Sequence, residues 1–257
     1  MVSQSLETLM LLVKLENDNR VTKKAVDKDK SPPKDKAVIV LTDVQGSTNL
    51  WESNPVAMKK ALALHDQIIR ASRAKFSGYE IDTEGDAFFL ALHNVVDAFG
   101  FALDLQKSLR EAQWDEDILS FPEACHDPVA NLRGLRVRMG IHLGEVTTRR
   151  NAVIGRLEYT GETMEVAKQV EGLADGGQIV TTLDTWKAAS FEAKTKLGDP
   201  TILQSDRTIS SQNRTKKVVQ VCVPGTSLDS NSCHRKLGSN KKAERRYSAY
   251  HARAQCY

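Results

Sequence analysis

The chain has 257 residues, 40% of them hydrophobic, and a net charge of +3. This length suits one domain with tails or two small domains, and the composition is that of a protein with an ordinary buried core. The sequence contains no run of about 18 apolar residues, which excludes a transmembrane helix within it. The short apolar stretch at 9–13 lacks the basic lead of a signal peptide. We therefore expect a cytoplasmic chain, or the cytoplasmic portion of a membrane-associated receptor.

The charge is distributed unevenly along the chain. Residues 205–257 contain eleven Lys and Arg against three Asp and Glu, so this stretch carries +8 and the remainder −5. We expect residues 225–257 to form a basic, disordered tail that either stays solvated or contacts an acidic partner or a membrane surface. The remainder has no basic stripe, so we expect no nucleic-acid partner. The four cysteines form no C-x-x-C pair, which favours reduced thiols.

The amino-terminal third begins with a charged segment. Residues 1–35 contain two consecutive prolines near their end and are expected to be a linker or the stub of a helix. Residues 37–41 are apolar and mostly β-branched, which predicts a buried strand, and 45–48 follow as a polar turn. Residues 55–75 place their apolar side chains on one helical face, with Pro55 in the first turn.

The following segments alternate between strand and helix patterns. We predict strands at 79–83, 87–91, 135–143, 178–182 and 218–223, and helices at 95–111 and 161–173. A polar excursion is predicted near 114–131 and a polar loop at 145–155. The order β-α-β-β-α-β predicts an α+β, ferredoxin-like domain over 36–224.

Two aspartates occupy positions at which metal chemistry is plausible. Asp43 directly follows the first strand, and Asp86 lies in the tight turn between the second and third strands. If the first strand lies beside that hairpin, the two carboxylates meet at one edge. Carboxylates together with water and phosphate oxygens are how proteins usually hold Mg²⁺, and the polar turn at 45–48 offers backbone N–H groups to phosphate. A lone aspartate at a strand end is more often a helix cap or a turn residue, so neither position is specific alone.

Four segments are specific when taken together. They are VIVLTDVQGSTNLWE (38–52), GYEIDTEGDAF (78–88), GLRVRMGIHLGEV (134–146) and ADGGQIV (174–180). In this order and spacing they resemble the catalytic domain of class III nucleotidyl cyclases, and fungal and trypanosomatid adenylyl cyclases most closely. The resemblance covers 36–186 and extends more weakly to 224.

This resemblance implies a cyclase that converts ATP into 3′,5′-cyclic AMP and pyrophosphate at a dimer interface. It implies that Asp43, the Val44 carbonyl and Asp86 bind two Mg²⁺ or Mn²⁺ ions, and that Arg138 contacts the triphosphate. The polar turn of Gly46, Ser47 and Thr48 would cradle phosphate oxygens. For Arg138, the alternative is a surface arginine on an edge strand.

The opposite half of the site departs from the family pattern. Asp82 stands where a lysine reads adenine, and Glu158 stands where an aspartate accepts from the adenine amino group. Glu165 and Gln169 replace the asparagine that orients the ribose and the arginine that stabilises the transition state. Lys168 is adjacent to Gln169, but a one-residue step on a helix turns it about 100° away.

Three readings follow from this division. The chain is a cyclase that works alone, a metal-bearing half that needs a complementary cyclase domain, or a degenerate binding or regulatory module. A ferredoxin-like interaction domain without a nucleotide site is a further alternative. The overall resemblance favours ATP, whereas a carboxylate at position 82 suits guanine, as in guanylyl cyclases. We favour a domain of adenylyl cyclase type that forms a homodimer, or a heterodimer with another cyclase domain.

Overall fold

The structure is a computed structural model that describes residues 31–128, 130–152, 155–212 and 214–223. Almost all of the predicted linker (1–35) and all of the predicted basic tail (225–257) lie outside these residues. The boundaries proposed for the domain, at 36 and 224, therefore stay predictions. Of the four cysteines, Cys125 and Cys222 are described, and among the described residues neither forms a disulfide.

The main sheet has seven strands in the order β2-β3-β1-β4-β7-β9-β8. Its strands are β1 (Lys36–Val44), β2 (Tyr79–Glu84), β3 (Ala87–Leu92), β4 (Val137–Glu145), β7 (Ile179–Thr182), β8 (Ile202–Ser211) and β9 (Arg214–Val221). β4 and β7 are parallel, and all other neighbours are antiparallel. The first four strands, with β3 and β4 on either side of β1, form the predicted βαββαβ unit, so the α+β fold is confirmed.

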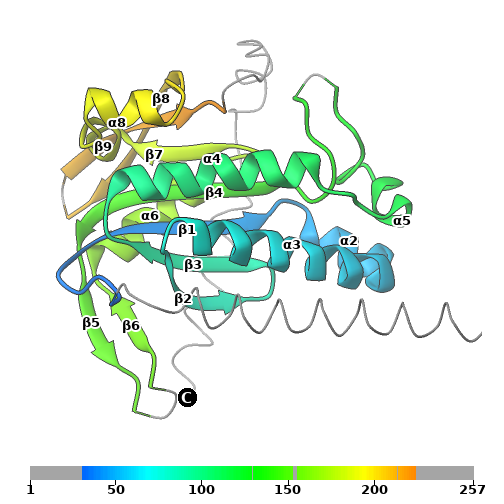
Figure 1. Cartoon of the computed structure of the whole chain (residues 1–257), viewed down its shortest axis with the longest axis horizontal. Coiled ribbons are helices and arrows are strands. Elements are labelled where there is room, and N and C mark those ends of the chain that lie inside the picture. The colour runs from blue at the N-terminus through cyan, green and yellow to red at the C-terminus, as the bar shows by residue number, and fades with distance from the viewer. Residues whose placement is uncertain (1–30, 129, 153–154, 213, 224–257) are drawn as a thin grey trace, which may run out of the picture. The chain divides into compact units, whose positions relative to one another are not determined.

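Helices cover both faces of this sheet (Figure 1). α3 (Pro55–Lys75) and α4 (Val95–Glu111) lie on one face, and α6 (Glu162–Gly172) lies on the other. Asn54 and Asn94 cap α3 and α4 by accepting from the N–H groups of Ala57 and Asp97. β1 alternates between the two cores, since Val38 and Val40 pack toward α3 and α4 whereas Ile39 and Leu41 pack toward α6.

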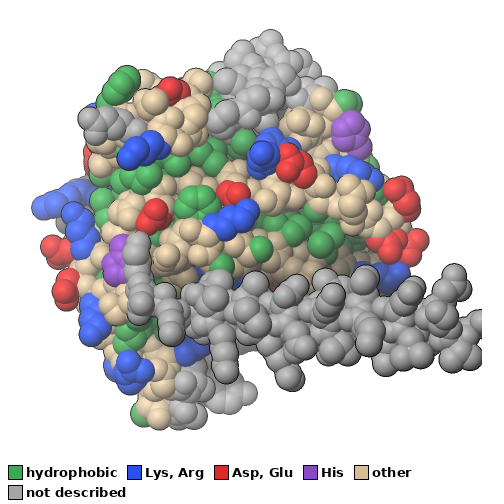
Figure 2. Space-filling model, in the orientation of Figure 1, with side chains coloured by type: hydrophobic (Ala, Val, Ile, Leu, Met, Phe, Trp, Pro, Cys, Tyr) green, Lys and Arg blue, Asp and Glu red, His purple; other side chains and the backbone are tan. Residues whose placement is uncertain are grey.

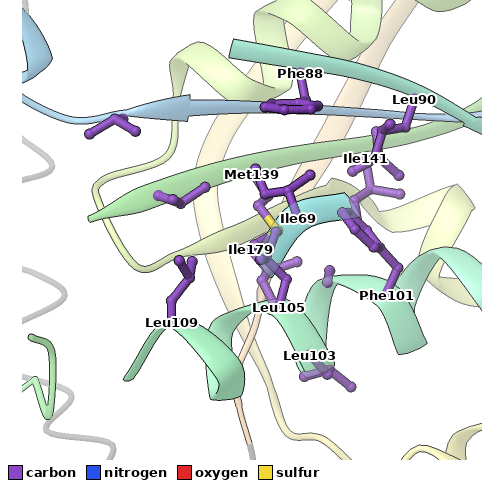
Figure 3. Close-up of a cluster of buried hydrophobic side chains, with 14 of the residues drawn as sticks. Ile69, Phe88, Leu90, Phe101, Leu103, Leu105, Leu109, Met139, Ile141 and Ile179 are labelled. Carbon is purple, nitrogen blue, oxygen red and sulfur yellow. The ribbon is translucent and has the colours of Figure 1, made fainter. Parts of the chain in front are cut away.

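The larger core lies between α3, α4 and the centre of the sheet. Figure 3 shows Phe101, Leu105 and Leu109 of α4 facing Met139 and Ile141 of β4. These five side chains are fully or almost fully buried, and burying each contributes roughly 1.5–3 kcal/mol. This packing holds β4 firmly in the centre of the sheet, next to β1.

The predicted polar loop at 145–155 is wrong. β4 continues to Glu145, and β5 (Thr147–Arg150) then pairs with β6 (Leu157–Thr160) in a separate two-stranded sheet. Leu157 and Tyr159 are buried, and the Tyr159 hydroxyl donates to the Pro33 carbonyl at 2.6 Å. The hairpin therefore forms because two apolar positions of β6 are covered by neighbouring elements, although most of its residues are polar.

The predicted excursion near 114–131 is anchored to the core. Trp114 and Ile118 are buried, and Trp114 Nε1 donates to the Leu109 carbonyl at 2.9 Å. Four short helices were not predicted: α2 (Ser47–Ser53), α5 (Glu116–Leu119), α7 (Leu183–Lys187) and α8 (Phe191–Lys196). Within the described ranges, no helix is both long enough and apolar enough to cross a bilayer.

On the face that carries α3 and α4, acidic and basic side chains are interspersed. Figure 2 shows red and blue side chains mixed across the described part of this face, with apolar side chains between them. A field of one sign therefore does not develop over this part of the surface.

Candidate functional site

Asp43 lies at the carboxyl end of β1, where the buried strand reaches the edge of the core. The strand residues before it, from Ala37 to Thr42, are almost completely buried. In the antiparallel ladder, Asp43 lies directly opposite Arg138 of β4. Asp43 shares its face of the sheet with Leu41, so its carboxylate lies on the side of α6.

Asp86 reaches the end of β1 from the adjacent hairpin. It follows Gly85, whose positive φ of 63° closes the turn between β2 and β3. Asp86 Oδ2 accepts from the Val44 N–H at 3.0 Å. The structure therefore brings the carboxylates of Asp43 and Asp86 to one edge, as the sequence predicted.

The electrostatics of Asp86 show that the two carboxylates interact. Burial raises the pKa of Asp86, and repulsion from Asp43 raises it further, against hydrogen bonds from the Val44 N–H and the Ser47 side chain. A cation between the two carboxylates would relieve this repulsion.

The residues present fit a divalent ion that retains water. In the described part of the chain, no three His, Cys, Asp or Glu residues are grouped to hold a metal ion. Two carboxylates are available, and Mg²⁺ typically takes one or two carboxylates and completes its shell with water and phosphate oxygens. Asp43, Asp86 and the Val44 carbonyl are the groups that would hold it.

Arg138 forms ion pairs with two acids. Its Nε donates to Asp43 Oδ2 at 3.0 Å, its Nη2 bonds to the same oxygen, and Nε lies 2.6 Å from Glu171 Oε1 of α6. Burial alone lowers the pKa of Arg138, but Glu171 and Asp43 outweigh it and raise the pKa above its usual value. Arg138 is thus a partly buried, charged residue of the site, rather than a free surface arginine.

Sequence reasoning missed Glu171. Burial raises the pKa of Glu171 to about 7 and repulsion from Asp43 adds to this, while Arg138 acts in the opposite direction. The available signal was weak: an acid near the end of a predicted helix, with an arginine two residues before a glycine on the predicted strand. Only the packing of α6 on β4 makes that combination meaningful.

The polar turn begins α2. Gly46 adopts φ 79°, and a Cβ built there would lie 2.8 Å from Glu123 Cγ of the excursion. Glu123 Oε1 also accepts from Asn49 Nδ2 at 3.3 Å. The Ser47 side chain hydrogen-bonds to the Asp86 carboxylate, which links the turn of Gly46, Ser47 and Thr48 to the metal-site candidates.

The four altered positions lie on other elements. Asp82 of β2 is exposed and accepts from the Thr83 N–H at 2.8 Å, next to an irregularity in the β2–β3 ladder. Glu158 of β6 accepts from Arg149 at 2.9 Å and from Asn151 at 2.5 Å. On α6, Glu165 is exposed and Gln169 is half-buried. In the described residues, Asp82 and Glu158 therefore bond to neighbours of their own hairpins and do not reach Asp43 or Asp86.

Comparison with known proteins identifies the family. The model of the adenylate and guanylate cyclase catalytic domain matches residues 30–211. An adenylate cyclase of Lachancea kluyveri is 39% identical over 158 residues, which are 60% of this chain and 9% of that protein. A receptor-type adenylate cyclase of Trypanosoma congolense is 33% identical over 66% of this chain and 26% of its own length. The chain thus spans only a small part of these relatives.

Solved structures agree on the fold. A chain from the structural analysis of adenylate cyclases from Trypanosoma brucei in their monomeric state is 26% identical, with a TM-score of 0.66. The match covers 77% of this chain and 93% of that one. The guanylate cyclase domain of RhGC from Catenaria anguillulae, solved with GTP, has a TM-score of 0.58 at 16% identity and supports the fold alone. With its βαββαβ core, its paired Asp43 and Asp86, and a family model that matches most of its length, this chain belongs to the adenylate and guanylate cyclase catalytic domain family.

Proposed function

We propose that this chain is the metal-bearing half of an adenylyl cyclase site that is completed by a complementary cyclase domain. The reaction is the conversion of ATP to 3′,5′-cyclic AMP: the ribose 3′-oxygen bonds to the α-phosphorus, loses its proton, and displaces pyrophosphate from it. The observation that carries the proposal is that Asp86 reaches the end of β1, where its carboxylate accepts from the Val44 N–H next to Asp43.

Residues of this chain would bind the metal ions and contact the triphosphate. Asp43, Asp86 and the Val44 carbonyl would hold two Mg²⁺ or Mn²⁺ ions, which would supply Lewis-acid activation of the 3′-hydroxyl and neutralise the triphosphate. Gly46, Ser47 and Thr48 would position phosphate oxygens, and Arg138 would contact the triphosphate.

The base and ribose side supports the need for a partner. Glu165 would place a carboxylate beside the ribose and triphosphate, and Gln169 carries no charge for the transition state. Loss of one such cation from a phosphoryl-transfer site costs roughly 10³-fold or more. A second domain that supplies lysine, asparagine and arginine at these positions would form one complete site with this chain.

The test is a complementation assay. Purified chain is incubated with Mn²⁺ and ATP or GTP, alone and with a cyclase domain that carries those three residues but lacks its own metal aspartates. We expect cyclic AMP only in the mixture. Product from the chain alone would show a self-sufficient cyclase, and no product in either would favour a regulatory module.

A guanylyl cyclase is the second candidate. Its support is the exposed carboxylate of Asp82, which can accept from guanine N1–H and the guanine amino group but cannot donate to adenine N1. The same assay with GTP in place of ATP decides between the two bases. By relation to receptor-type cyclases we further propose that the domain acts in the cytoplasm, as part of a membrane receptor or free of one.

A further inference from the structure

Arg138 and a divalent cation would use the same ligand atom. Both Nε and Nη2 of Arg138 bond to Oδ2 of Asp43. This carboxylate is also the candidate metal ligand that projects from β1. A guanidinium at this oxygen and a metal ion at this oxygen would repel each other at contact distance, so the two are alternatives.

Glu171 lies against Arg138 at this position. Its Oε1 lies 2.6 Å from Arg138 Nε, and both side chains are largely shielded, with exposed fractions of 15% for Glu171 and 22% for Arg138. A partly buried guanidinium beside Asp43 and Glu171 keeps its charge, because both acids favour the charged form.

The backbone fixes the position of Glu171. Gly140 lies two residues after Arg138 on the same face of β4, and a Cβ there would be 2.3 Å from the Glu171 nitrogen. The absence of a side chain at Gly140 lets α6 approach β4 closely at that point. Glu171 is therefore placed beside Arg138 by the contact between helix and strand, not by a flexible side chain alone.

We propose that Arg138 is an internal competitor for the divalent cation at Asp43. This inference rests on the proposed function, because it takes Asp43 to be a metal ligand. In the free chain Arg138 neutralises Asp43 and lowers its affinity for metal. The phosphate oxygens of a bound triphosphate would accept from Arg138, which would leave Asp43 available to hold the metal. The site thus favours the metal–triphosphate complex over free metal.

The test measures how tightly the isolated chain binds Mn²⁺ without nucleotide. The concentration of unbound Mn²⁺ is determined from its electron paramagnetic resonance signal. Arg138→Met removes the competing charge while keeping a long side chain, and we expect it to bind Mn²⁺ on the order of tenfold more tightly than the unmodified chain, the usual size of such a coupling. Arg138→Gln, which keeps hydrogen-bonding capacity, is expected to give the same direction if the Met variant folds poorly. Arg133→Met is the matched control, since Arg133 pairs with Glu116 and carries the same charge outside the site.

The outcomes separate this inference from the proposed function. Tighter Mn²⁺ binding by Arg138→Met or Arg138→Gln, unchanged binding by Arg133→Met and loss of binding by Asp43→Asn support it. Equal or weaker binding by both Arg138 variants, with Asp43→Asn still abolishing binding, overturns it and leaves the metal site intact. No Mn²⁺ binding by any of the proteins overturns both.

Discussion

The two halves of the candidate site differ in how their residues are held. On the candidate metal side, Asp43 of β1 accepts from Arg138 of β4, and Asp86, in the turn between β2 and β3, accepts from the Val44 N–H. On the base-reading side, Asp82 lies at a ladder irregularity and Glu158 bonds within its own hairpin. The candidate metal side is thus tied to the central strands β1 and β4, whereas Asp82 and Glu158 lie on peripheral hairpins. Substitutions at Asp82 and Glu158 can therefore leave the geometry around Asp43 and Asp86 intact.

The largest effect on activity is expected from removing a carboxylate of the candidate metal site. In the complementation assay, Asp43→Asn or Asp86→Asn is expected to lower cyclic nucleotide formation about 10³-fold, because several kcal/mol of metal stabilisation is lost. Each variant should bind the partner domain as the unmodified chain does, which size-exclusion chromatography checks. Activity retained by both variants would show that this edge of the sheet does not carry the chemistry.

The second prediction concerns restoring the family's residues at the altered positions 82, 165 and 169. The combined variant Asp82→Lys, Glu165→Asn, Gln169→Arg restores the residue types that an adenylyl site uses, and activity of the chain alone with Mn²⁺ and ATP is expected to rise by roughly 10³-fold. The matched control adds Asp43→Asn to the same three changes and should remain inactive. If the restored chain stays inactive while correctly folded, the division of the site into an intact and an altered half is wrong.

A third prediction concerns the packing that supports the metal side. Gly140→Ala would place a methyl group 2.3 Å from the Glu171 nitrogen, so α6 must shift, and we expect a loss of about 1–3 kcal/mol in the free energy of unfolding. Urea unfolding measures this. Gly172→Ala is the control, since a Cβ there meets nothing within 4 Å and alanine favours helix. Equal midpoints for the two variants would show that the close approach is not required.

The smallest expected effect is a pH dependence. Burial raises the pKa of Glu171 to about 7 in the folded chain, above its value of 4.5 when unfolded. Between these values the folded state binds more protons than the unfolded state, so Glu171 contributes stability below pH 4.5 that is lost as pH rises toward 7. Glu171→Gln should therefore flatten the decline of the unfolding free energy between pH 5 and 7, by on the order of 1 kcal/mol. Parallel curves for the two proteins would contradict this origin.

The sequence predicted the elements whose apolar pattern is strong. The β-branched run of β1 and the one-sided apolar faces of α3 and α4 determine their structure locally. β8 was not predicted, because its residues are mostly polar and it lies at the sheet edge, where only one neighbour is needed. The β5–β6 hairpin was taken for a loop for a related reason, since the buried apolar residues of β6, Leu157 and Tyr159, are covered by residues distant in sequence.

The site residues that lie at strand ends were predictable, whereas those brought together by tertiary packing were not. The pairing of Asp43 with Asp86 follows from strand ends and one assumption about neighbours, and the structure brings the two together. The bond between Arg138 and Asp43 required the β1–β4 register, which one sequence does not reveal. Glu171 required the approach of α6 to β4, and Glu123 required the path of the excursion back to the Gly46 turn. These are contacts of tertiary structure without local pattern.

Gly140 determines the distance between α6 and β4 at this point. Most helices contact a sheet through interlocking side chains. Here the main chain of α6 lies against the main chain of β4, because Gly140 has no Cβ atom. Side chains can change rotamer, whereas two peptide backbones in contact have almost no such freedom. The backbone that carries Glu171 next to Arg138 therefore does not readily rearrange, so Arg138 can change partners without changing the spacing between α6 and β4.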